Sequence, residues 1–364
     1  MGTYHIAVLG GDGIGPEVTA EAAQVLRAVG QRFGHSFECT EALCGARAVE
    51  QEGAAISEET MALCQQSDAV LFGAVGGTKP GDPGSPKQPE NALFRLRKEC
   101  ELFANLRPVK VRPGLLDAST IKPDVLEGVD LIVVRELTGG LYFGKPSEIR
   151  QGANGMEAID TLFYSEYEIE RAVRMAFELA RHRRKSVTSV DKANVLSSSR
   201  LWRQVAERVA ADYPDMTLTH LLVDACAMNL VSQPKNFDIL VMENMFGDIL
   251  TDEASMLVGS LGMLPSASLG TRRTAHGVFG LYEPIHGTAP QITGQGIANP
   301  LGAISSMSLL LRYSCGLLPE ADAVEEAVDA VLAAGYHTAD LRGDQAKVVG
   351  SRRMGELTAE HVLG

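Results

Sequence analysis

Two aspartates, Asp248 and Asp252, lie four residues apart in the apolar stretch NMFGDILTDEASML. On a helix this spacing places both carboxylates on one face, where they repel each other by roughly a few tenths of a kcal/mol. A lysine, an arginine or a metal ion must offset that repulsion. A third aspartate, Asp224, ends the apolar run LLVD. Three carboxylates without softer ligands suit Mg²⁺ or Mn²⁺, whereas a helix-dipole role is the alternative for Asp248 alone.

Three arginines are candidates for binding an anionic substrate. Arg97 and Arg107 lie in ALFRLRKECELFANLRPVKV, and Arg135 ends the apolar run VDLIVVR. A guanidinium fork matches the geometry of a carboxylate. A surface ion pair is the alternative for any one of them, but three arginines beside predicted strand ends favour a polycarboxylate site.

Two further residues are candidates for proton transfer. Tyr142 lies among glycines in TGGLYFG, where the backbone can approach a ligand closely. Lys192 follows a predicted strand in SVDKANVL, and lysine changes its pKa readily on burial. A structural role is the alternative for each residue alone.

Two glycine-containing segments could bind phosphate. In LGGDGIGPEV, Gly11 and Gly13 are spaced as in G-x-G-x-x-G, but Pro16 stands where the third glycine belongs. A usual Rossmann site is therefore disfavoured, and a tight turn from strand to helix is the alternative. The segment EPIHGTAPQITGQGIANP, residues 283–300, could offer backbone N–H groups to a phosphate.

Short apolar runs alternate with helical patterns along the chain. The predicted strands are YHIAVLG, DAVLFGAV, VDLIVVREL, SVTSVD, LTHLLVDA and FDILVMEN. Helical spacing of apolar residues predicts helices over GPEVTAEAAQVLRAVG, 165–181 and 201–213. This order indicates an α/β fold with a largely parallel sheet. Residues 76–90 contain four prolines and form a predicted loop, and residues 149–156 form a hairpin tip or a disordered loop.

The composition of the chain indicates which kinds of binding partner and which cellular compartment to expect. The chain has 364 residues and a net charge of −13, so nucleic acid is not expected as a partner. Six cysteines without a C-x-x-C pair predict free thiols in a reducing compartment. Without a signal pattern or an apolar run of membrane-spanning length, we expect a cytoplasmic protein that has no membrane partner.

Taken together, these segments resemble the 3-isopropylmalate dehydrogenase family, within the β-decarboxylating dehydrogenases. The resemblance covers essentially the whole chain and rests on LRKECELFANLRP, VRELTGGLYFG, DKANVL, NMFGDILTDEASML, GSLGMLPSASL and EPIHGTAP. VRELTGG is typical of the isopropylmalate branch, whereas the isocitrate and homoisocitrate branches usually read VRENTEG. The implied reaction is NAD-dependent oxidative decarboxylation of (2R,3S)-3-isopropylmalate to 4-methyl-2-oxopentanoate and CO₂, in leucine biosynthesis.

The resemblance also implies an architecture. The two-domain α/β fold has a largely parallel sheet and is not a usual Rossmann fold. A larger cofactor-binding domain contains residues 1–102 and 259–364, and a smaller central domain, 103–258, forms a homodimer with shared active sites. The implied cofactors are NAD and Mg²⁺ or Mn²⁺.

Site residues are implied by motif position. The catalytic pair is Tyr142 and Lys192, the latter from the partner chain, and the metal ligands are Asp248, Asp252 and the partner's Asp224. The substrate contacts are Arg97, Arg107, Arg135, Asp224, Leu93 and Phe94. The NAD contacts are Ile14, Gly76, Gly77, Glu90, Asn194, Glu283, His286, Gly287, Thr288, Ala289, Pro290, Gln291, Ile292 and Asn299.

At two positions the chain departs from the family pattern. Gln291 and Ile292 stand where NAD-using members usually carry Asp first and NADP-using relatives carry Lys-Tyr, so we expect NAD with weaker discrimination against NADP. Phe94 stands where the family commonly has Leu, beside the alkyl group of the substrate. The alternatives are a dehydrogenase of another 3-alkylmalate, a Mg²⁺-dependent lyase or phosphatase without redox chemistry, and a non-catalytic binding protein.

Overall fold

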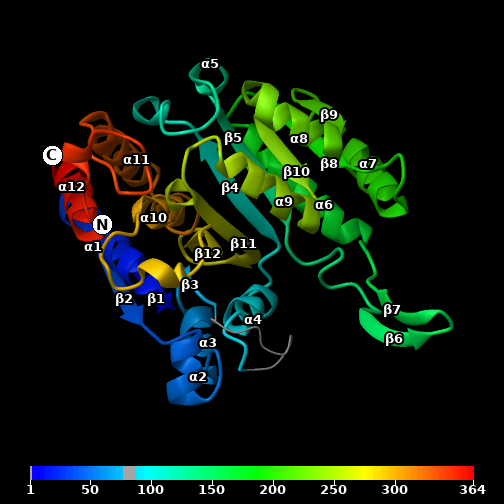
Figure 1. Ribbon diagram of the computed structural model, residues 1–364, viewed down its shortest axis with the longest axis horizontal. Coiled ribbons are helices and arrows are strands. Elements are labelled where there is room, and N and C mark those ends of the chain that lie inside the picture. The colour runs from blue at the N-terminus through cyan, green and yellow to red at the C-terminus, as the bar shows by residue number, and fades with distance from the viewer. Residues whose placement is uncertain (1, 77–86) are drawn as a thin grey trace. The chain divides into compact units, whose positions relative to one another are not determined.

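The computed structural model describes residues 2–76 and 87–364 (Figure 1). The chain divides into unit 1, which comprises Met1–Leu102, Val111–Pro123 and Val258–Gly364, and unit 2, which comprises Phe103–Lys110 and Asp124–Leu257. Val111–Pro123 therefore clusters with the two chain ends, whereas the family resemblance implied that it lies in the central domain. The reason is the buried Arg112, which bonds Glu325 at 2.5 Å and also pairs with Asp329.

In the described residues, unit 1 is built on five strands. Their order is β2 (Ser36–Glu41), β1 (Thr3–Gly11), β3 (Ala69–Ala74), β12 (Val278–Pro284) and β11 (Pro265–Arg273). Each pair is parallel except β11 with β12. All six residues of β3 are buried, as expected for a central strand with helices on both faces.

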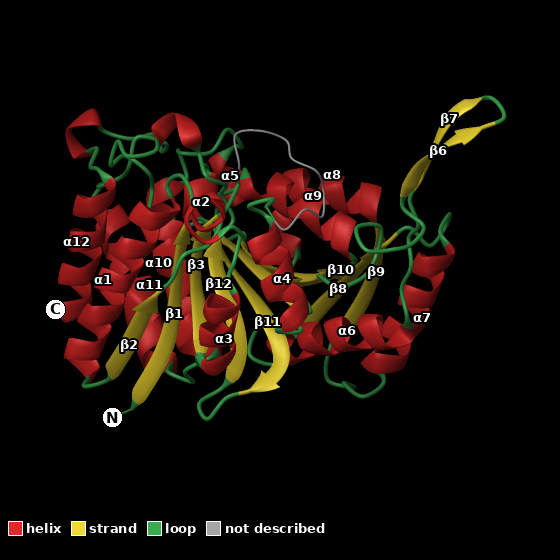
Figure 2. Cartoon of the chain, turned by 90° about the horizontal axis from the view of Figure 1, so that it is seen from below, coloured by secondary structure: helices red, strands yellow, loops and turns green. Residues whose placement is uncertain are grey.

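Helices cover both faces of this sheet. Val70 and Phe72 of β3 lie in one core cluster with Met61 and Leu96, which belong to α3 and α4. The helices of this face are α2 (Ala46–Glu52), α3 (Glu58–Gln66) and α4 (Asn91–Glu99). The helices of the other group, seen together beside β1 and β2 in Figure 2, are α1 (Gly15–Phe33), α10 (Leu301–Tyr313), α11 (Leu318–Ala333) and α12 (Ser351–Leu363).

Unit 2 is also a helix-covered sheet. Its strand order is β4 (Ala104–Lys110), β5 (Asp130–Glu136), β10 (Ile239–Met242), β8 (Ser186–Asp191) and β9 (Thr217–Leu222). β4 and β5 are antiparallel, and the remaining pairs are parallel. The helices that contact these strands are α6 (Glu166–Ala180), α7 (Ser197–Ala210), α8 (Val223–Ser232) and α9 (Asn244–Ser255).

The pairing of β10 with β5 brings predicted site residues of unit 2 close together. Met242, the last residue of β10, pairs with Arg135 of β5. Since α9 begins two residues after Met242, Arg135 lies beside the start of the helix that carries Asp248 and Asp252.

A hairpin projects from the rest of unit 2 (Figures 1 and 2). Its strands are β6 (Glu148–Gly152) and β7 (Gly155–Ile159), so residues 149–156 form a hairpin and not a disordered loop. Ile149 and Met156 are 73% and 67% exposed on it.

The remaining elements of the described residues are short. They are α5 (Pro123–Leu126) and the 3₁₀ turns η1 (Pro113–Leu115), η2 (Pro234–Asn236), η3 (Leu261–Met263), η4 (Pro290–Ile292) and η5 (Gln345–Lys347). The six strands and three helices predicted from the sequence are all present, and the six cysteines, all in the described ranges, are free thiols. In residues 2–76 and 87–364, none of the helices has the length and apolar character needed to cross a membrane.

Candidate active site

Helix α9 presents the two aspartates from its second and third turns. The helix begins at Asn244, and the Glu243 carboxylate accepts the N–H groups of Met245 at 3.1 Å and Phe246 at 2.9 Å. Its first turn has no acidic side chain. Asp248 therefore lies beyond the residues that a helix dipole stabilises most, and the dipole alternative loses its support.

Arginines face the aspartate pair. Arg135, only 4% exposed, pairs with Asp248. Arg107 lies 3.9 Å from Asp248 and 3.6 Å from Asp252. These guanidinium groups supply the positive charge that the spacing of the two carboxylates requires.

Tyr142 belongs to the same cluster. Its hydroxyl donates a hydrogen bond of 2.9 Å to Asp248, and its ring lies 5.9 Å from the Arg135 guanidinium carbon. Partial burial raises the pKa of the Tyr142 phenol, and the Asp248 carboxylate raises it further. The phenol is therefore favoured in its protonated form, in which it can donate a proton.

Lys192 and Asp224 form a separate pair in unit 2. The Lys192 ammonium bonds the Asp224 carboxylate and lowers its pKa. Among residues 2–76 and 87–364, no group of three or more His, Cys, Asp or Glu side chains is arranged to hold a metal ion. The three predicted metal ligands therefore do not meet within one chain, and the contribution of Asp224 from a partner stays a prediction.

The α9 aspartates nevertheless fit a divalent cation. They provide hard carboxylate oxygens from one helix face, and the Asp252 side chain is 71% exposed. A cation bound there would need further oxygen ligands from a substrate, water or a second chain.

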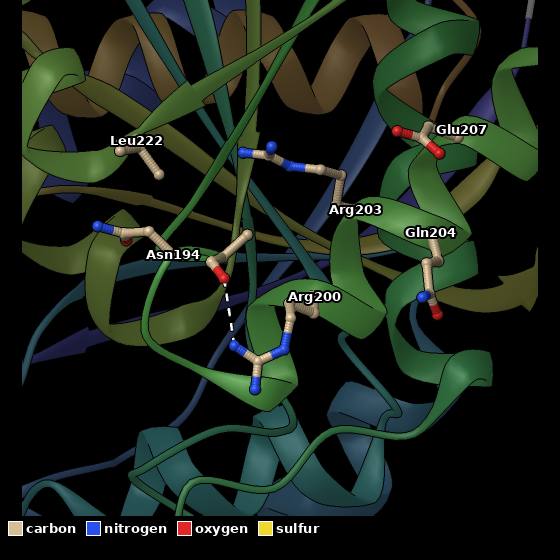
Figure 3. Close-up of a pocket in the computed structure, with 7 residues that line it drawn as sticks. Asn194, Arg200, Arg203, Gln204, Glu207 and Leu222 are labelled. Atoms are coloured by element: carbon tan, nitrogen blue, oxygen red, sulfur yellow. Dashed lines mark hydrogen bonds between the residues drawn. The ribbon is translucent and has the colours of Figure 1, made fainter.

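A cavity of about 460 Å³ in unit 2 is lined mainly by residues of helix α7 and of the segment before it (Figure 3). The Arg203 fork on its wall makes two 2.9 Å bonds to the buried Asp191, and Arg200 donates to the Ala193 carbonyl at 3.3 Å. Asn194, a predicted NAD contact, lies on the same wall. The full lining is Ala193, Asn194, Arg200, Arg203, Gln204, Glu207 and Leu222.

In unit 1, predicted NAD contacts meet at the turn between β1 and α1. The Ile14 N–H donates to the Thr288 carbonyl at 2.9 Å. Gly13 has φ +58°, and a Cβ there would lie 2.0 Å from that carbonyl oxygen, so only glycine fits. A Cβ on Gly76 would lie 3.5 Å from both Glu90 and Thr288. Gly77 lies outside the described residues.

Asp12 in this turn has a role that sequence reasoning missed. Its buried carboxylate accepts the N–H of Ala46 at 2.9 Å, that of Gly76 at 3.2 Å and that of Arg47 at 3.4 Å. It thereby ties the β1–α1 turn to the start of α2 and to the end of β3. The clue in the sequence was an acidic residue between two glycines.

The loop after β12 holds the other NAD candidates. His286 Nδ1 lies 2.9 Å from the Gly287 carbonyl, while Nε2 is buried and has no hydrogen-bond partner among the described residues. Burial lowers the pKa of His286, which favours the neutral ring. A buried ring nitrogen without a partner fits a bound polar group, such as part of a nucleotide.

Two of the remaining candidates in this loop differ in their surroundings. Gln291 is exposed in η4, which follows Ala289 with φ +42°. The buried Asn299 side chain instead accepts from the Leu301 N–H at 3.0 Å and donates to Asp340 at 3.1 Å, so it supports the start of α10.

Helix α4 carries Leu93, Phe94 and Arg97. Arg97 donates to Glu283 at 3.1 Å, and Phe94, one helical turn earlier, is 49% exposed. The expectation that the three arginines lie beside strand ends was therefore wrong for two of them. Arg97 lies in the last turn of a helix and Arg107 in the middle of β4, and only Arg135 lies near a strand end.

Comparisons with known proteins identify the family and the fold of the chain. A family model described as "Isocitrate/isopropylmalate dehydrogenase" matches residues 5–358. The isocitrate dehydrogenase structure from Methylococcus capsulatus superposes with a TM-score of 0.85 at 32% identity and covers 99% of this chain and 100% of that one. The chain thus belongs to the isocitrate/isopropylmalate dehydrogenase family and has its α/β fold.

Within the family, similar curated relatives carry one name. The 3-isopropylmalate dehydrogenase of Geobacillus kaustophilus is 57% identical over 100% of this chain and 96% of its own length. The 3-isopropylmalate dehydrogenase of Dehalococcoides mccartyi is 54% identical over 99% of this chain and 100% of its own.

Proposed function

We propose that the protein catalyses the NAD-dependent oxidative decarboxylation of (2R,3S)-3-isopropylmalate to 4-methyl-2-oxopentanoate and CO₂, a step in leucine biosynthesis. The observation that carries this proposal is the cluster of Arg107, Arg135, Tyr142, Asp248 and Asp252 in unit 2. It combines anion-binding groups, a proton donor and hard metal ligands, which together suit a hydroxy dicarboxylic acid. Relatives named for this reaction support the choice within the family.

Each residue proposed for the site, in the cluster or outside it, has a task in this reaction. Arg97, Arg107 and Arg135 bind the two malate carboxylates and hold C2 and C3 in a reactive orientation. Asp248, Asp252 and the Asp224 of a second copy are the proposed ligands of Mg²⁺ or Mn²⁺, which when bound lowers the pKa of the C2 hydroxyl.

The proton transfers fall to two side chains. Lys192 of a second copy accepts the C2 hydroxyl proton, and NAD held by unit 1 would supply the hydride acceptor for C2. The resulting β-keto acid loses CO₂, and Tyr142 then donates a proton to C3 of the enolate. The bond from Tyr142 to Asp248 holds the phenol beside the proposed metal ligands before substrate arrives.

The same proposal includes a homodimer. Large apolar side chains are exposed on the neighbouring helices α8 and α9 and at the end of α9, namely Met228, Val231, Ile249 and Met256, at 49–65% exposure. An apolar face of this kind is covered in an isologous dimer. Asp224 lies in the first turn of α8, and within one chain it does not join the α9 aspartates. A second copy seated on this face therefore supplies the third carboxylate in the proposal.

NAD occupies unit 1 in this proposal. Ile14, Gly76, Glu90 and Thr288 gather at the β1–α1 turn, and the buried His286 Nε2 offers a partner to a polar group. Gln291 does not repel a phosphate, so the preference for NAD over NADP is weaker than an aspartate would give.

A direct assay tests the reaction. The protein is mixed with Mn²⁺, NAD and a panel of 3-substituted malates, and near-UV absorbance of NADH is followed; a parallel series contains NADP. We expect the highest kcat/KM with 3-isopropylmalate and NAD. A preference for another alkyl group would indicate a different 3-alkylmalate, with Phe94 as the residue to examine. Substrate loss without NADH would indicate a non-redox lyase and contradict the proposal.

A further inference from the structure

Asn244, the first residue of α9, has a side-chain amide that is bonded at both ends. The residue is 1% exposed. Its Oδ1 accepts from Arg135 Nε at 2.9 Å, and its Nδ2 donates to the carbonyls of Leu137 at 3.3 Å and Gly139 at 3.2 Å. The orientation of the amide is determined, because an arginine nitrogen only donates and a carbonyl only accepts.

These bonds join the three segments that build the unit 2 site. Arg135 is held at Nε by Asn244 and at a terminal nitrogen by Asp248. The Leu137–Gly139 turn leads directly to Tyr142, whose hydroxyl also reaches Asp248. The Asn244 amide therefore links helix α9, which carries the aspartates, to Arg135 of β5 and to the turn that precedes Tyr142.

Helix α9 touches Arg135 at a second position. A Cβ on Gly247 would lie 2.6 Å from Arg135 Cγ and 2.7 Å from its Cβ. Helix and arginine stem can approach this closely only because residue 247 has no side chain. Backbone packing thus fixes the stem of Arg135, and Asn244 fixes its guanidinium.

We propose that Asn244 is a positioning residue for substrate binding. It sets the Arg135 guanidinium, and the turn that leads to Tyr142, relative to Asp248. This inference rests on the proposed function, in which Arg135 binds a malate carboxylate. Asn244 itself has no contact with substrate in this scheme, and its effect passes through Arg135.

The test is a double-mutant cycle on substrate binding. The dissociation constant of 3-isopropylmalate is measured by calorimetry with Mg²⁺ for Asn244→Ala, Arg135→Lys and the double variant. Lysine has no guanidinium fork, so the contact with residue 244 is lost in that background. We expect Asn244→Ala to weaken binding about tenfold to a hundredfold in the wild type, and about twofold or less in the Arg135→Lys background.

A conservative variant separates positioning from folding. Asn244→Asp keeps an acceptor toward Arg135 Nε but loses the donations to the two carbonyls. We expect its dissociation constant to stay within about threefold of wild type, while kcat falls because the turn before Tyr142 is released. If Asn244→Ala fails to fold, Asn244→Asp alone still tests whether Asn244 positions Arg135 and the turn before Tyr142. The matched control is Asn236→Ala, which removes an exposed amide bonded to Gln233 at 2.9 Å and should leave both quantities unchanged.

The results of these experiments separate a failure of the Asn244 role from a failure of the proposed function. Wild-type protein that binds no 3-isopropylmalate would overturn the proposed function. Wild-type binding combined with equal losses in both backgrounds, or with Asn244→Asp as weak as Asn244→Ala, would overturn the role of Asn244 alone.

Discussion

The Asp248 carboxylate lies close to three other side chains of the unit 2 site. It pairs with Arg135, lies 3.9 Å from Arg107 and accepts from Tyr142 at 2.9 Å. We expect Asp248→Asn to weaken Mn²⁺ binding about tenfold to a hundredfold, because the charge of the ligand set controls affinity. Since the variant also leaves the buried Arg135 without its carboxylate, unfolding free energy should fall by about 1–3 kcal/mol.

Electron paramagnetic resonance of free Mn²⁺ measures the affinity without turnover, and urea unfolding measures the stability. The control is Asp212→Asn, which alters an exposed carboxylate paired with Arg174 at 2.9 Å in the same unit. Unchanged Mn²⁺ affinity in Asp248→Asn would remove Asp248 from the metal site.

Gln291 is the residue that should tune cofactor choice. An aspartate there can accept charge-assisted bonds from the ribose hydroxyls of NAD and would repel the 2′-phosphate of NADP. Gln291→Asp should therefore raise the preference for NAD, mostly by worsening NADP by about 1–3 kcal/mol. The measurement is the ratio of kcat/KM for the two cofactors, with Gln295→Asp in the same exposed loop as control. An equal shift in both variants would mean that general charge, and not contact at position 291, is responsible.

The family resemblance implied that Asp248, Arg135 and Tyr142 share one site, and in the structure these three side chains are in contact. Their roles in binding and catalysis stay predictions. Asp12 and Asn244 were passed over, because their partners lie 34 and 109 residues away. A buried carboxylate or amide reveals its role only through such distant partners.

At the scale of elements, the packing of α1 against α12 contains an unusual carboxyl group. Glu21 Oε2 is buried and has no hydrogen-bond partner in residues 2–76 and 87–364, and a Cβ on Gly355 of α12 would lie 2.2 Å from it. Burial, and then the charge of Glu356, raises the pKa of Glu21 to about 7. The charged groups that act on it are Glu17 and Arg27 of α1 and Arg352 and Glu356 of α12.

The sign of the resulting pH dependence follows from the raised pKa. Folding favours the protonated form of Glu21. The contribution of Glu21 protonation to the free energy of unfolding is therefore complete below the unfolded pKa of about 4.5 and is lost as pH rises through 7. Glu21→Gln should therefore match wild type near pH 4.5 and be more stable above pH 7, by about 1–2 kcal/mol after allowance for partial exposure. Urea unfolding across this range measures the difference. A constant difference at every pH would contradict the role of Glu21 titration.

Elements with a strong period were predictable, and others were not. β3 and β5 are short apolar runs, and α6 has one apolar face, so the sequence pattern predicted each of these elements. Helix α10 is buried from Leu301 to Leu311 and thus lacks an amphipathic period. β2 is largely exposed at the edge of its sheet and has little apolar signal.

At the scale of the whole molecule, the proposed dimer with shared sites can be tested by complementation. Lys192→Ala and Arg97→Ala should each be inactive, because each proposed site takes Arg97 from one chain and Lys192 from the other. After dissociation and reassembly of an equal mixture, half of the dimers are mixed and half of their sites are intact, so about a quarter of wild-type activity should return. Light scattering and a tag on one variant verify exchange. No recovery with verified exchange would mean that each chain builds its own site.

The discontinuous make-up of unit 1 also has a consequence during synthesis. β3 completes its pairing with β12, which is more than 200 residues further along the chain. All the strands of unit 2 leave the ribosome before β12 does, and during that interval the apolar β3 has an open edge. From the synthesis of β3 until that of β12, the nascent chain therefore carries an apolar strand edge that is open to edge-to-edge aggregation.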